Sequence, residues 1–585
     1  MASVGRFGRF RKVDRQTRAG YARRLRPGLR MGPAMHNGAP EHFDAVVVGS
    51  GFGGSVTAYR LAEAGKHVCL LERGKPYPPG SFPRSPLGFS KNFWDPSEGL
   101  YGMFNVWRFS GIDALVSSGL GGGSLIYANL MIRKDEHWFV HEDGESWPVS
   151  RADLEPHYDR CEKMLAVQKY PLDAEPYAST AKTLAFRDAA KRLGHDWFLP
   201  DLAVTFANDG DAPVPGEPIR EQHPNLHGRT RYTCRLVGEC DVGCNYGSKN
   251  SLDYTYLSAA ARHGADLRSC CEVKTFGPRD GGGFEVDYVE HKPEEGPKAA
   301  SPGTMTADTL VLSAGTLGST FLLLKNRNAF PALPAALGTH FCGNGDLLTF
   351  ALRCREQINP DFGPVITSAV RVGDAADGDG SSGRGFYIED AGYPSFVSWM
   401  LQATDEPRSL WLWRKTVLRL LWKWIRRQPQ PDISGAVSSF LGDSRLSAGL
   451  LPLLGMGRDV PEGRMRLDDK LLDVDWSKDG ASKAYFDRLR DTMHALADEL
   501  GGTFEDNPLW WLSKVITVHA LGGCPMGRDA NEGVVDSWGR VFGVPGLHVA
   551  DGSVMSGPVG PNPSLTIAAL ADRFADGIID GRQQP

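Results

Sequence analysis

The sequence predicts an α/β fold built around a nucleotide-binding turn, and two observations carry this prediction. Residues 43–74, FDAVVVGSGFGGSVTAYRLAEAGKHVCLLERG, place a glycine-rich turn between a β-branched run and a segment with helical spacing of apolar residues. The chain has 585 residues, which exceeds what one hydrophobic core usually supports. We therefore expect two domains or one large composite, with a parallel sheet in its first part.

The glycine-rich turn has each part that a dinucleotide cradle needs. Residues 45–48 suit a buried strand, residues 49–54 match G-x-G-x-x-G, and residues 55–64 have helical spacing. Residues 67–71 then form a second strand that ends at Glu72, a carboxylate able to accept hydrogen bonds from ribose hydroxyls. Glycine lets the backbone approach a pyrophosphate at the helix N-terminus. The pattern alone does not separate NAD from FAD.

A second glycine cluster follows at residues 117–133, SSGLGGGSLIYANLMIR. Three consecutive glycines, residues 121–123, allow a backbone surface flush against a planar ligand or a phosphate. The apolar segment 125–131 directly after them indicates a buried, defined turn rather than a flexible loop.

These motifs, together with three later ones, resemble the glucose–methanol–choline (GMC) family of FAD oxidoreductases, and are nearest its bacterial cholesterol oxidase branch. The later motifs are CRLVGECDVGCNYGSKNSLDYTYLSAAARHGADL at 234–267, LVLSAGTLGSTFLLLKN at 310–326, and VHALGGCPMG with the following GPVGPNPSLT between 518 and 566. The resemblance covers roughly residues 43–133, 231–346 and 515–580.

The resemblance implies a Rossmann-like FAD-binding domain assembled from discontinuous segments, 41–135, 226–346 and 515–585. An α+β substrate domain with a mainly antiparallel sheet would comprise 136–225 and 347–514. Some family members bind FAD covalently through a histidine in the second glycine motif, and this chain has none there, so we expect non-covalent FAD.

The expected cofactor contacts lie at strand ends, in the two glycine turns, and after the strands near 310 and 547. They are Gly49, Gly51, Phe52, Gly53, Gly54, Glu72, Gly121, Gly122, Gly123, Ser124, Asn129, Ala314, Gly315, Asp551, Gly552 and Pro563.

His519 and Asn562 are the expected catalytic pair. His519 follows the apolar run 515–518, which predicts a strand end beside a glycine turn. Asn562 precedes a helix expected to begin at Pro563 or Ser564, and we expect it to act as the N-cap. In the family a His–His or His–Asn pair occupies the site, so the resemblance gives His519 the hydroxyl proton and Asn562 the substrate oxygen. A metal site with Cys524 is disfavoured because further ligands are missing nearby.

Glu389 is a third candidate, in GFYIEDAGYPSF at 385–396. In cholesterol oxidases a glutamate on a comparable strand moves a proton during double-bond isomerisation, and Glu389 is our candidate for that place. An ordinary surface carboxylate pair with Asp390 is the alternative.

Residues 408–427, RSLWLWRKTVLRLLWKWIRR, contain seven basic residues, four tryptophans and no acid. Two interpretations stay open: an amphipathic helix lying on anionic lipid, or a helix packed on the core with its Arg and Lys stems extending around it. The first implies peripheral membrane contact and entry of an apolar substrate from the membrane.

Three cysteines, Cys234, Cys240 and Cys244, raise the question of an iron–sulfur cluster. Their spacing matches no cluster signature, so we interpret them as packing thiols and expect no metal. Ten cysteines are too few for a disulfide framework and indicate a reducing, cytoplasmic setting.

The N-terminal 40 residues carry ten Lys and Arg against one acid, Asp14, so their net charge is +9 and that of the remainder is −14 (−5 − 9). We interpret them as a disordered basic tail; a transit peptide, or a start at Met31 or Met35, are alternatives. No apolar run is long enough to cross a bilayer.

The expected reaction is oxidation of an alcohol by hydride transfer to FAD, with a 3-hydroxysteroid such as cholesterol as substrate and isomerisation through Glu389 as a second step. The electron acceptor would be oxygen or another acceptor, and no nucleic acid is expected as a partner. One alternative is a long-chain or other apolar alcohol dehydrogenase that uses a non-oxygen acceptor. Another is an FAD-binding, membrane-docking protein without alcohol turnover.

Overall fold

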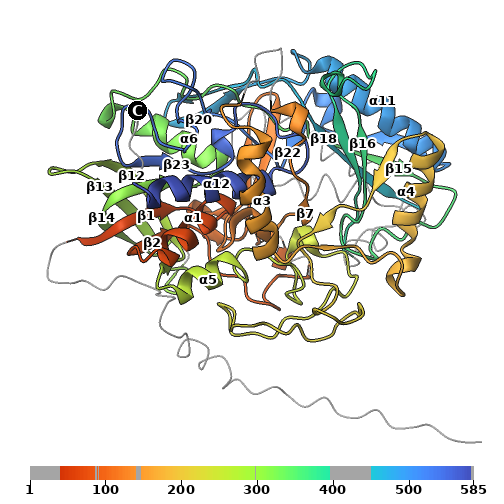
Figure 1. The fold of residues 1–585 in the computed structure, drawn as a ribbon, viewed down its shortest axis with the longest axis horizontal. Coiled ribbons are helices and arrows are strands. Elements are labelled where there is room, and N and C mark those ends of the chain that lie inside the picture. The colour runs from red at the N-terminus through yellow and green to blue at the C-terminus, as the bar shows by residue number, and fades with distance from the viewer. Residues whose placement is uncertain are drawn as a thin grey trace, which may run out of the picture.

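A computed structural model describes residues 40–85, 88–89, 91–139, 147–296, 298–394 and 449–581. Two large sheets lie on the left and right of the molecule in Figure 1. The predicted basic tail and the predicted helix 408–427 lie outside the described residues.

The first sheet is parallel at its centre and has the order β11-β2-β1-β14-β23. These strands are β1 (Glu41–Val48), β2 (Val68–Leu71), β11 (Asp266–Arg268), β14 (Ala300–Leu312) and β23 (Leu547–Val549). The three valines that end β1 are buried, and each fully buried valine contributes about 1.5–3 kcal/mol. The sheet joins distant parts of the chain, as the discontinuous domain requires.

One edge of β14 is divided between two partners. Its first half pairs with the hairpin of β12 (Cys271–Pro278) and β13 (Phe284–His291), and its second half pairs with β23. β12 and β13 are antiparallel neighbours along the chain and form a hairpin. The long strand carries both the hairpin and the C-terminal strand into one sheet.

Helices cover the parallel sheet in a stack that Figure 1 shows at the centre of the molecule. α1 (Phe52–Glu63) packs on α12 (Ser564–Ile579), and α12 packs on α3 (Arg151–Met164). α3 comes from the segment 136–225 that the sequence assigns to the substrate domain, yet it packs on the nucleotide-binding side. The remaining helices of this half are α5 (Tyr256–Arg262) and α6 (Gly315–Lys325).

The second sheet is antiparallel throughout, with the order β21-β15-β18-β17-β16-β9. Its strands are β9 (Asp196–Phe198), β15 (Leu347–Leu352), β16 (Ala369–Val372), β17 (Phe386–Asp390), β18 (Leu451–Gly457) and β21 (Thr503–Asp506). The expected mainly antiparallel sheet is confirmed.

Helices α4 (Ala181–Arg192) and α11 (Lys483–Glu499) cover one face of this second sheet. Asp390 points to that face, where it contacts α4. Because side chains alternate along a strand, Glu389 points to the opposite face. Its cross-strand neighbour is Leu454, which pairs in turn with Leu348.

Short elements complete the frame. β22 (Val515–Thr517) runs parallel to β6 (Ile112–Ser117), which pairs with β5 (Phe104–Arg108). The others are β3 (Trp94–Asp95), β4 (Leu100–Tyr101), β7 (Leu130–Met131), β8 (Gln168–Lys169), β10 (Asp201–Leu202), β19 (Arg464–Asp468) and β20 (Leu471–Asp475). Among the described residues, no helix has the length and apolar character needed to cross a membrane.

Candidate active site

The first glycine turn joins β1 to α1 and contains both packed and open positions. Gly49 has φ of 99°, a conformation that side chains rarely adopt. A Cβ at Gly53 would lie 1.5 Å from the Ala550 carbonyl oxygen, and one at Gly54 would lie 2.0 Å from the Gly49 carbonyl oxygen. A Cβ at Gly51 would meet nothing within 4 Å. Since α1 begins at Phe52, this open space lies at the helix N-terminus, where free N–H groups bind phosphate.

Glu72 follows β2 at the same edge of the sheet and is 5% exposed. Its Oε2 accepts hydrogen bonds from Ser50 N at 3.0 Å and Ser50 Oγ at 2.7 Å, and its Oε1 accepts one from Gly74 N at 2.8 Å. Each carboxylate oxygen has more than one lone pair, so capacity remains for ribose hydroxyls. The predicted acid is therefore positioned beside the turn.

The second glycine cluster packs directly on the first. A Cβ at Gly122 would lie 2.5 Å from Gly51 Cα, and Gly121 N donates to Ser50 Oγ at 3.0 Å. A Cβ at Gly123 would meet nothing within 4 Å. Ser124 Oγ is used within the chain, since it donates to Gly121 O at 2.7 Å.

Asn129 lies at the end of the second glycine motif with φ of 75°. It is fully buried, and its side-chain oxygen has no hydrogen-bond partner among the described residues. A buried polar atom without a partner is costly, so Asn129 fits a contact with a bound polar group.

The remaining expected cofactor contacts lie at the ends of β14 and β23. Ala314 is followed by Gly315, which has φ of 77° and open space at its Cβ position. Asp551 follows β23, but its carboxylate bonds within the chain: Oδ1 accepts from Ser553 N at 2.9 Å, and Oδ2 accepts from Ser319 Oγ at 2.5 Å. Gly552 begins the short helical turn that Asp551 caps. The open glycine positions and the unpartnered Asn129 oxygen thus fit a dinucleotide laid across the strand ends.

His519 lies just beyond the end of β22, as predicted. Its Nδ1 is 2.8 Å from Asp346 Oδ1, and its backbone N donates to Thr517 Oγ1 at 2.9 Å. The His519 side chain is 14% exposed and that of Asp346 is 2% exposed. The buried carboxylate of Asp346 therefore orients the imidazole ring through its Nδ1 atom.

Asn562 and Glu389 lie close together, and Glu389 is also within electrostatic reach of Asp346. Glu389 is fully buried, and neither carboxylate oxygen makes a well-formed hydrogen bond to a described residue. Burial raises the pKa of Glu389 well above its usual range; the charges of Asp390 and Asp346 raise it further, and the nearby Asn562 amide offsets part of the shift. Asn562 is 7% exposed, and its amide oxygen has no partner among the described residues.

Two details of the sequence interpretation are wrong here. Pro563, not Asn562, is the N-cap of α12, and no side chain caps that helix. Glu389 and Asp390 are not a surface pair either, since both are fully buried. They also differ from each other: Asp390 accepts from Thr367 N at 2.9 Å and Ser368 N at 2.7 Å and pairs with buried Lys182 at 3.4 Å. Asp390 is thus satisfied within the fold, whereas Glu389 is not.

The sequence interpretation missed the segment 343–346, which contacts His519 and the loop that leads to Asn562. Asp346 contacts His519, and Asn344 bonds the loop 559–561 that leads to Asn562. The sequence signal that could have indicated this segment is the pair Asn344 and Asp346 in FCGNGDLL (341–348). These two polar residues stand directly before a strand, where a hydrophobic run would otherwise be expected.

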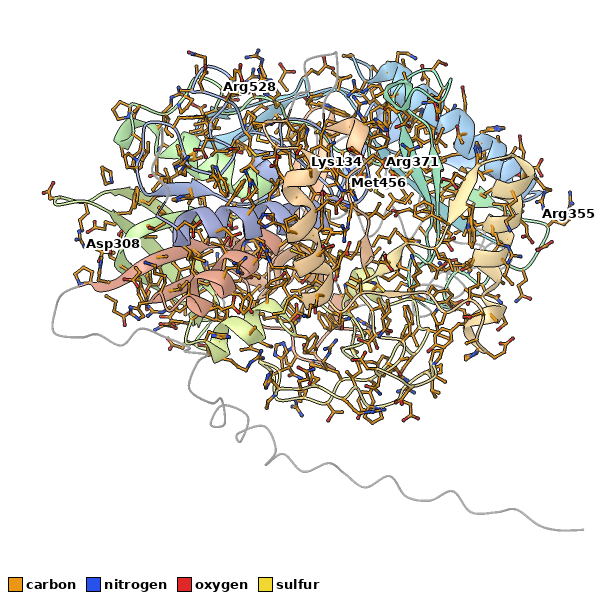
Figure 2. The ribbon with its side chains drawn as sticks, viewed as in Figure 1. Lys134, Asp308, Arg355, Arg371, Met456 and Arg528 are labelled. Carbon is orange, nitrogen blue, oxygen red and sulfur yellow. The ribbon has the colours of Figure 1, made fainter. Side chains whose placement is uncertain are left out.

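Residues 134 and 135 bond, respectively, to the loop that leads to Asn562 and to the antiparallel sheet. Lys134 Nζ donates to Pro558 O at 2.8 Å, and Arg371 Nε on β16 donates to Asp135 Oδ2 at 3.1 Å. Figure 2 labels Lys134 together with Arg371 and Met456, which lie on β16 and β18 of the antiparallel sheet. The site therefore lies where the two halves join.

The cysteines contribute packing at the positions that the structure describes. Cys234, Cys240 and Cys524 are buried, and burial raises the pKa of each thiol. Among the described residues, a cluster with metal-ligand reach occurs at His157, Asp572 and Asp576. Arg60 and Arg160 pair with both of its carboxylates, so the cluster is an ion-pair network between α1, α3 and α12.

Fold and site together define a dinucleotide-binding oxidoreductase, and comparisons with known proteins specify the family. Residues 461–571 match the family model described as GMC oxidoreductase, and residues 47–77 match that of an NAD(P)-binding Rossmann-like domain. A cholesterol oxidase from Mycobacterium tuberculosis is 30% identical over 91% of this chain and 90% of its own length. The long-chain-alcohol oxidase FAO4B from Arabidopsis thaliana is 23% identical over 92% of this chain and 68% of its own length. The crystal structure of pyridoxine 4-oxidase from Mesorbium loti superposes with a TM-score of 0.57 at 16% identity, covering 92% of this chain and 100% of that one.

The chain belongs to the GMC oxidoreductase family, whose members oxidise alcohols. It is an FAD flavoprotein with a Rossmann-like cofactor domain. The expectation of FAD rather than NAD is confirmed.

Proposed function

We propose that this chain oxidises an apolar alcohol to a carbonyl, with a 3-hydroxysteroid such as cholesterol as the substrate class. The observation that carries the proposal is a buried carboxyl, Glu389, beside the amide of Asn562, close to the Asp346–His519 pair. The 30% identical cholesterol oxidase supports the sterol, and the Arabidopsis relative supports a long-chain alcohol as the rival.

His519 removes the hydroxyl proton in this proposal. Alcohol oxidation requires the O–H proton to leave as the C–H bond breaks, and imidazole suits that task near neutral pH. Its Nδ1 faces Asp346, so Nε2 is the atom that accepts the proton. Asn562 donates from its amide to the substrate oxygen without titrating. The acceptor for the hydride that leaves the alcohol carbon would be supplied by bound FAD.

The sheet face that carries Glu389 supports an apolar substrate. Leu348 and Leu454 flank it across the strands, and Phe350, Tyr393 and Leu450 form a buried apolar cluster beside Leu348. A hydrophobic wall with a few polar groups is typical of a site for an apolar ligand. A sugar would leave its hydroxyls unpaired against such a wall.

Glu389 serves as the proton carrier of a following isomerisation in this proposal. Burial raises its pKa, so its neutral form can deliver a proton near neutral pH, and its ionised form is basic enough to remove one from an activated carbon. In this proposal FAD is bound non-covalently. The FAD-binding domain comprises 41–135, 226–346 and 515–585, and the substrate domain comprises 136–225 and 347–514.

Anaerobic mixing of the purified holoenzyme with a panel of sterols, long-chain primary alcohols and small alcohols tests the proposal. We expect flavin absorbance to bleach with 3-hydroxysteroids at rates above those with the other alcohols. If only the long-chain alcohols bleach the flavin, the substrate class is long-chain alcohols and not 3-hydroxysteroids. Reoxidation by oxygen or by a quinone then separates an oxidase from a dehydrogenase.

A protein that binds FAD and docks on membranes without turnover is the rival from another class. Under our proposal the basic, tryptophan-rich segment 408–427 contacts anionic lipid and admits the substrate. Deletion of this segment should abolish sedimentation with phosphatidylserine vesicles and leave turnover of a short, water-soluble alcohol. Unchanged vesicle binding would remove the membrane role, and no bleaching with any alcohol would favour the rival.

A further inference from the structure

Asp346 bonds to three consecutive residues, Thr517, Val518 and His519. Its Oδ1 lies 2.8 Å from His519 Nδ1, and its Oδ2 accepts from Val518 N at 2.8 Å. The Thr517 hydroxyl lies 2.8 Å from the same Oδ2 and 3.0 Å from the Gly343 carbonyl. One carboxylate therefore fixes both the backbone and the ring of the histidine segment.

We propose that Asp346 is the positioning residue that keeps the His519 proton on Nδ1 and so leaves Nε2 as the proton acceptor. An ionised carboxylate only accepts hydrogen bonds, so the His519 nitrogen facing it must donate. Among the described residues, none forms a hydrogen bond to Nε2, and the side chain as a whole is 14% exposed. The structural part of this inference stands alone, and its catalytic consequence rests on the proposed function.

The charges around Asp346 give the imidazolium a defined counter-charge. Asp459, which follows β18, acts on this region together with Glu389 on β17 and Tyr485 on α11. Asp459 accepts from Gly343 N at 2.9 Å, and burial raises its pKa to about 7. Arg384 is a cation that acts on both Asp459 and Tyr485, and its guanidinium bonds the Asp459 carbonyl at 3.1 Å. His519 is the one ion-pair partner of Asp346 within the described ranges. When His519 takes the substrate proton, Asp346 therefore stabilises the resulting positive charge.

The contacts of Asp346 fix how an asparagine would be oriented at this position, so Asp346→Asn should change the tautomer of His519 in a predictable way. Val518 N must donate to the atom at the Oδ2 position, so the amide oxygen of the new asparagine is drawn there. The amide NH2 then faces His519 Nδ1, which must become an acceptor, and the imidazole proton moves to Nε2. The nitrogen facing the substrate would then be a donor and could not take the proton. An equivalent aspartate-to-asparagine change in the serine protease triad lowers kcat about 10⁴-fold through the wrong tautomer.

The test combines kinetics with 15N NMR of the holoenzyme labelled at histidine. The chain has 15 histidines, so the His519 signals are assigned by their loss in His519→Gln. We expect the wild type to carry its proton on Nδ1 and Asp346→Asn to carry it on Nε2. We also expect kcat to fall about 10²- to 10⁴-fold, with KM changed only a few-fold. Asp346→Glu keeps the charge and should restore the Nδ1–H tautomer and part of kcat.

Asp459→Asn is the matched control, because it neutralises a buried carboxylate that bonds the same 343–346 segment but not His519. It should leave the tautomer in place. An unchanged tautomer and kcat in Asp346→Asn would overturn the inference, as would an Nε2–H tautomer in the wild type. Absence of alcohol turnover in the wild type would instead reject the proposed function, while the NMR result would still decide the role of Asp346.

Discussion

Asn344 and Gly560 exchange two hydrogen bonds beside the candidate active site. Gly560 N donates to Asn344 Oδ1 at 3.0 Å, and Asn344 Nδ2 donates to Gly560 O at 3.2 Å. Asn344 Oδ1 also accepts from Val559 N at 2.9 Å, and Nδ2 reaches Pro561 O at 3.1 Å. One buried amide thus satisfies four backbone groups of the loop that ends at Asn562.

Asn344→Gly should loosen that loop without straining its own backbone, because φ at this position is 51° and glycine adopts it freely. Two buried N–H groups lose their acceptor, which costs about 1–3 kcal/mol for each unsatisfied group. We expect a lower Tm and a lower kcat with FAD retained. Asn359→Gly, at φ of 49° outside the site, is the control and should change neither kcat nor Tm by a comparable amount.

His519→Ala should abolish turnover while FAD stays bound. Removal of a general base lowers rates by about 10²- to 10⁴-fold. The measurement is kcat at saturating alcohol, with flavin absorbance per mole of protein as the check on cofactor content. His494→Ala, at an exposed position on α11, is the matched control. Full activity in His519→Ala would reject the base assignment.

Gly51→Ala and Gly53→Ala should separate cofactor binding from folding. A methyl group at Gly53 would collide with the Ala550 carbonyl oxygen, so Gly53→Ala should lower Tm or prevent folding. A methyl group at Gly51 meets no protein atom within 4 Å, so Gly51→Ala should fold normally and bind FAD more weakly. Titration of the apoprotein with FAD measures this. Gly277 on β12 also has open space at its Cβ position, so Gly277→Ala is the control and should bind FAD like the wild type. If Gly51→Ala also binds FAD with wild-type affinity, this placement of the pyrophosphate is wrong.

Glu389→Gln should leave alcohol oxidation largely intact and remove isomerisation. The amide has nearly the same shape but cannot carry a proton between carbons. With cholesterol, the unconjugated ketone should accumulate in place of the conjugated one, which absorbs strongly in the ultraviolet. Asp390→Asn provides the contrast, because its bonds to Thr367, Ser368 and Lys182 make it structural, so its effect should appear mainly as a lower Tm. Conjugated product from Glu389→Gln at the wild-type rate would contradict the proposal.

His548 on β23 should make the cofactor domain sensitive to acid. Burial lowers its pKa from 6.5 to about 4, although a contact with the Gly546 carbonyl acts in the opposite direction. A histidine with a lowered folded-state pKa takes up its proton more readily when unfolded. Above pH 6.5 His548 is neutral in both the folded and the unfolded state, so it does not change the free energy of unfolding. The folded state loses stability as the pH falls from about 6.5 to 4. His548→Gln should reduce the fall of Tm over that interval, and parallel Tm curves for both proteins would rule the effect out.

Local patterns were sufficient for the cofactor half of the fold. The valine run before Gly49, the hairpin at 271–291 and the apolar strand ending at Leu312 all carry their signals within short windows. β1 and β14 begin earlier than their apolar runs suggest, because their first residues are held by pairing with each other and with β13 rather than by burial on both faces. Such tertiary pairing cannot be read from one segment alone.

The catalytic surroundings were less accessible to prediction. His519 and Asn562 lie in recognisable motifs, but Asp346 and Asn344 act through residues that are 173 and 216 positions away in the chain. Nothing in the local spacing of an asparagine and an aspartate before a strand distinguishes a surface turn from a buried clamp. The burial of Glu389 likewise depends on what covers the face of β17 opposite α4, and this is a property of the assembled fold.

β17 and β18 are hydrogen-bonded neighbours although Asp390 and Leu451 bound a long intervening stretch of chain. Their ladder places Glu389 opposite Leu454, so backbone pairing sets the register of the apolar wall. Side chains of that wall can therefore be exchanged to reshape the substrate face while the strand that carries Glu389 keeps its place.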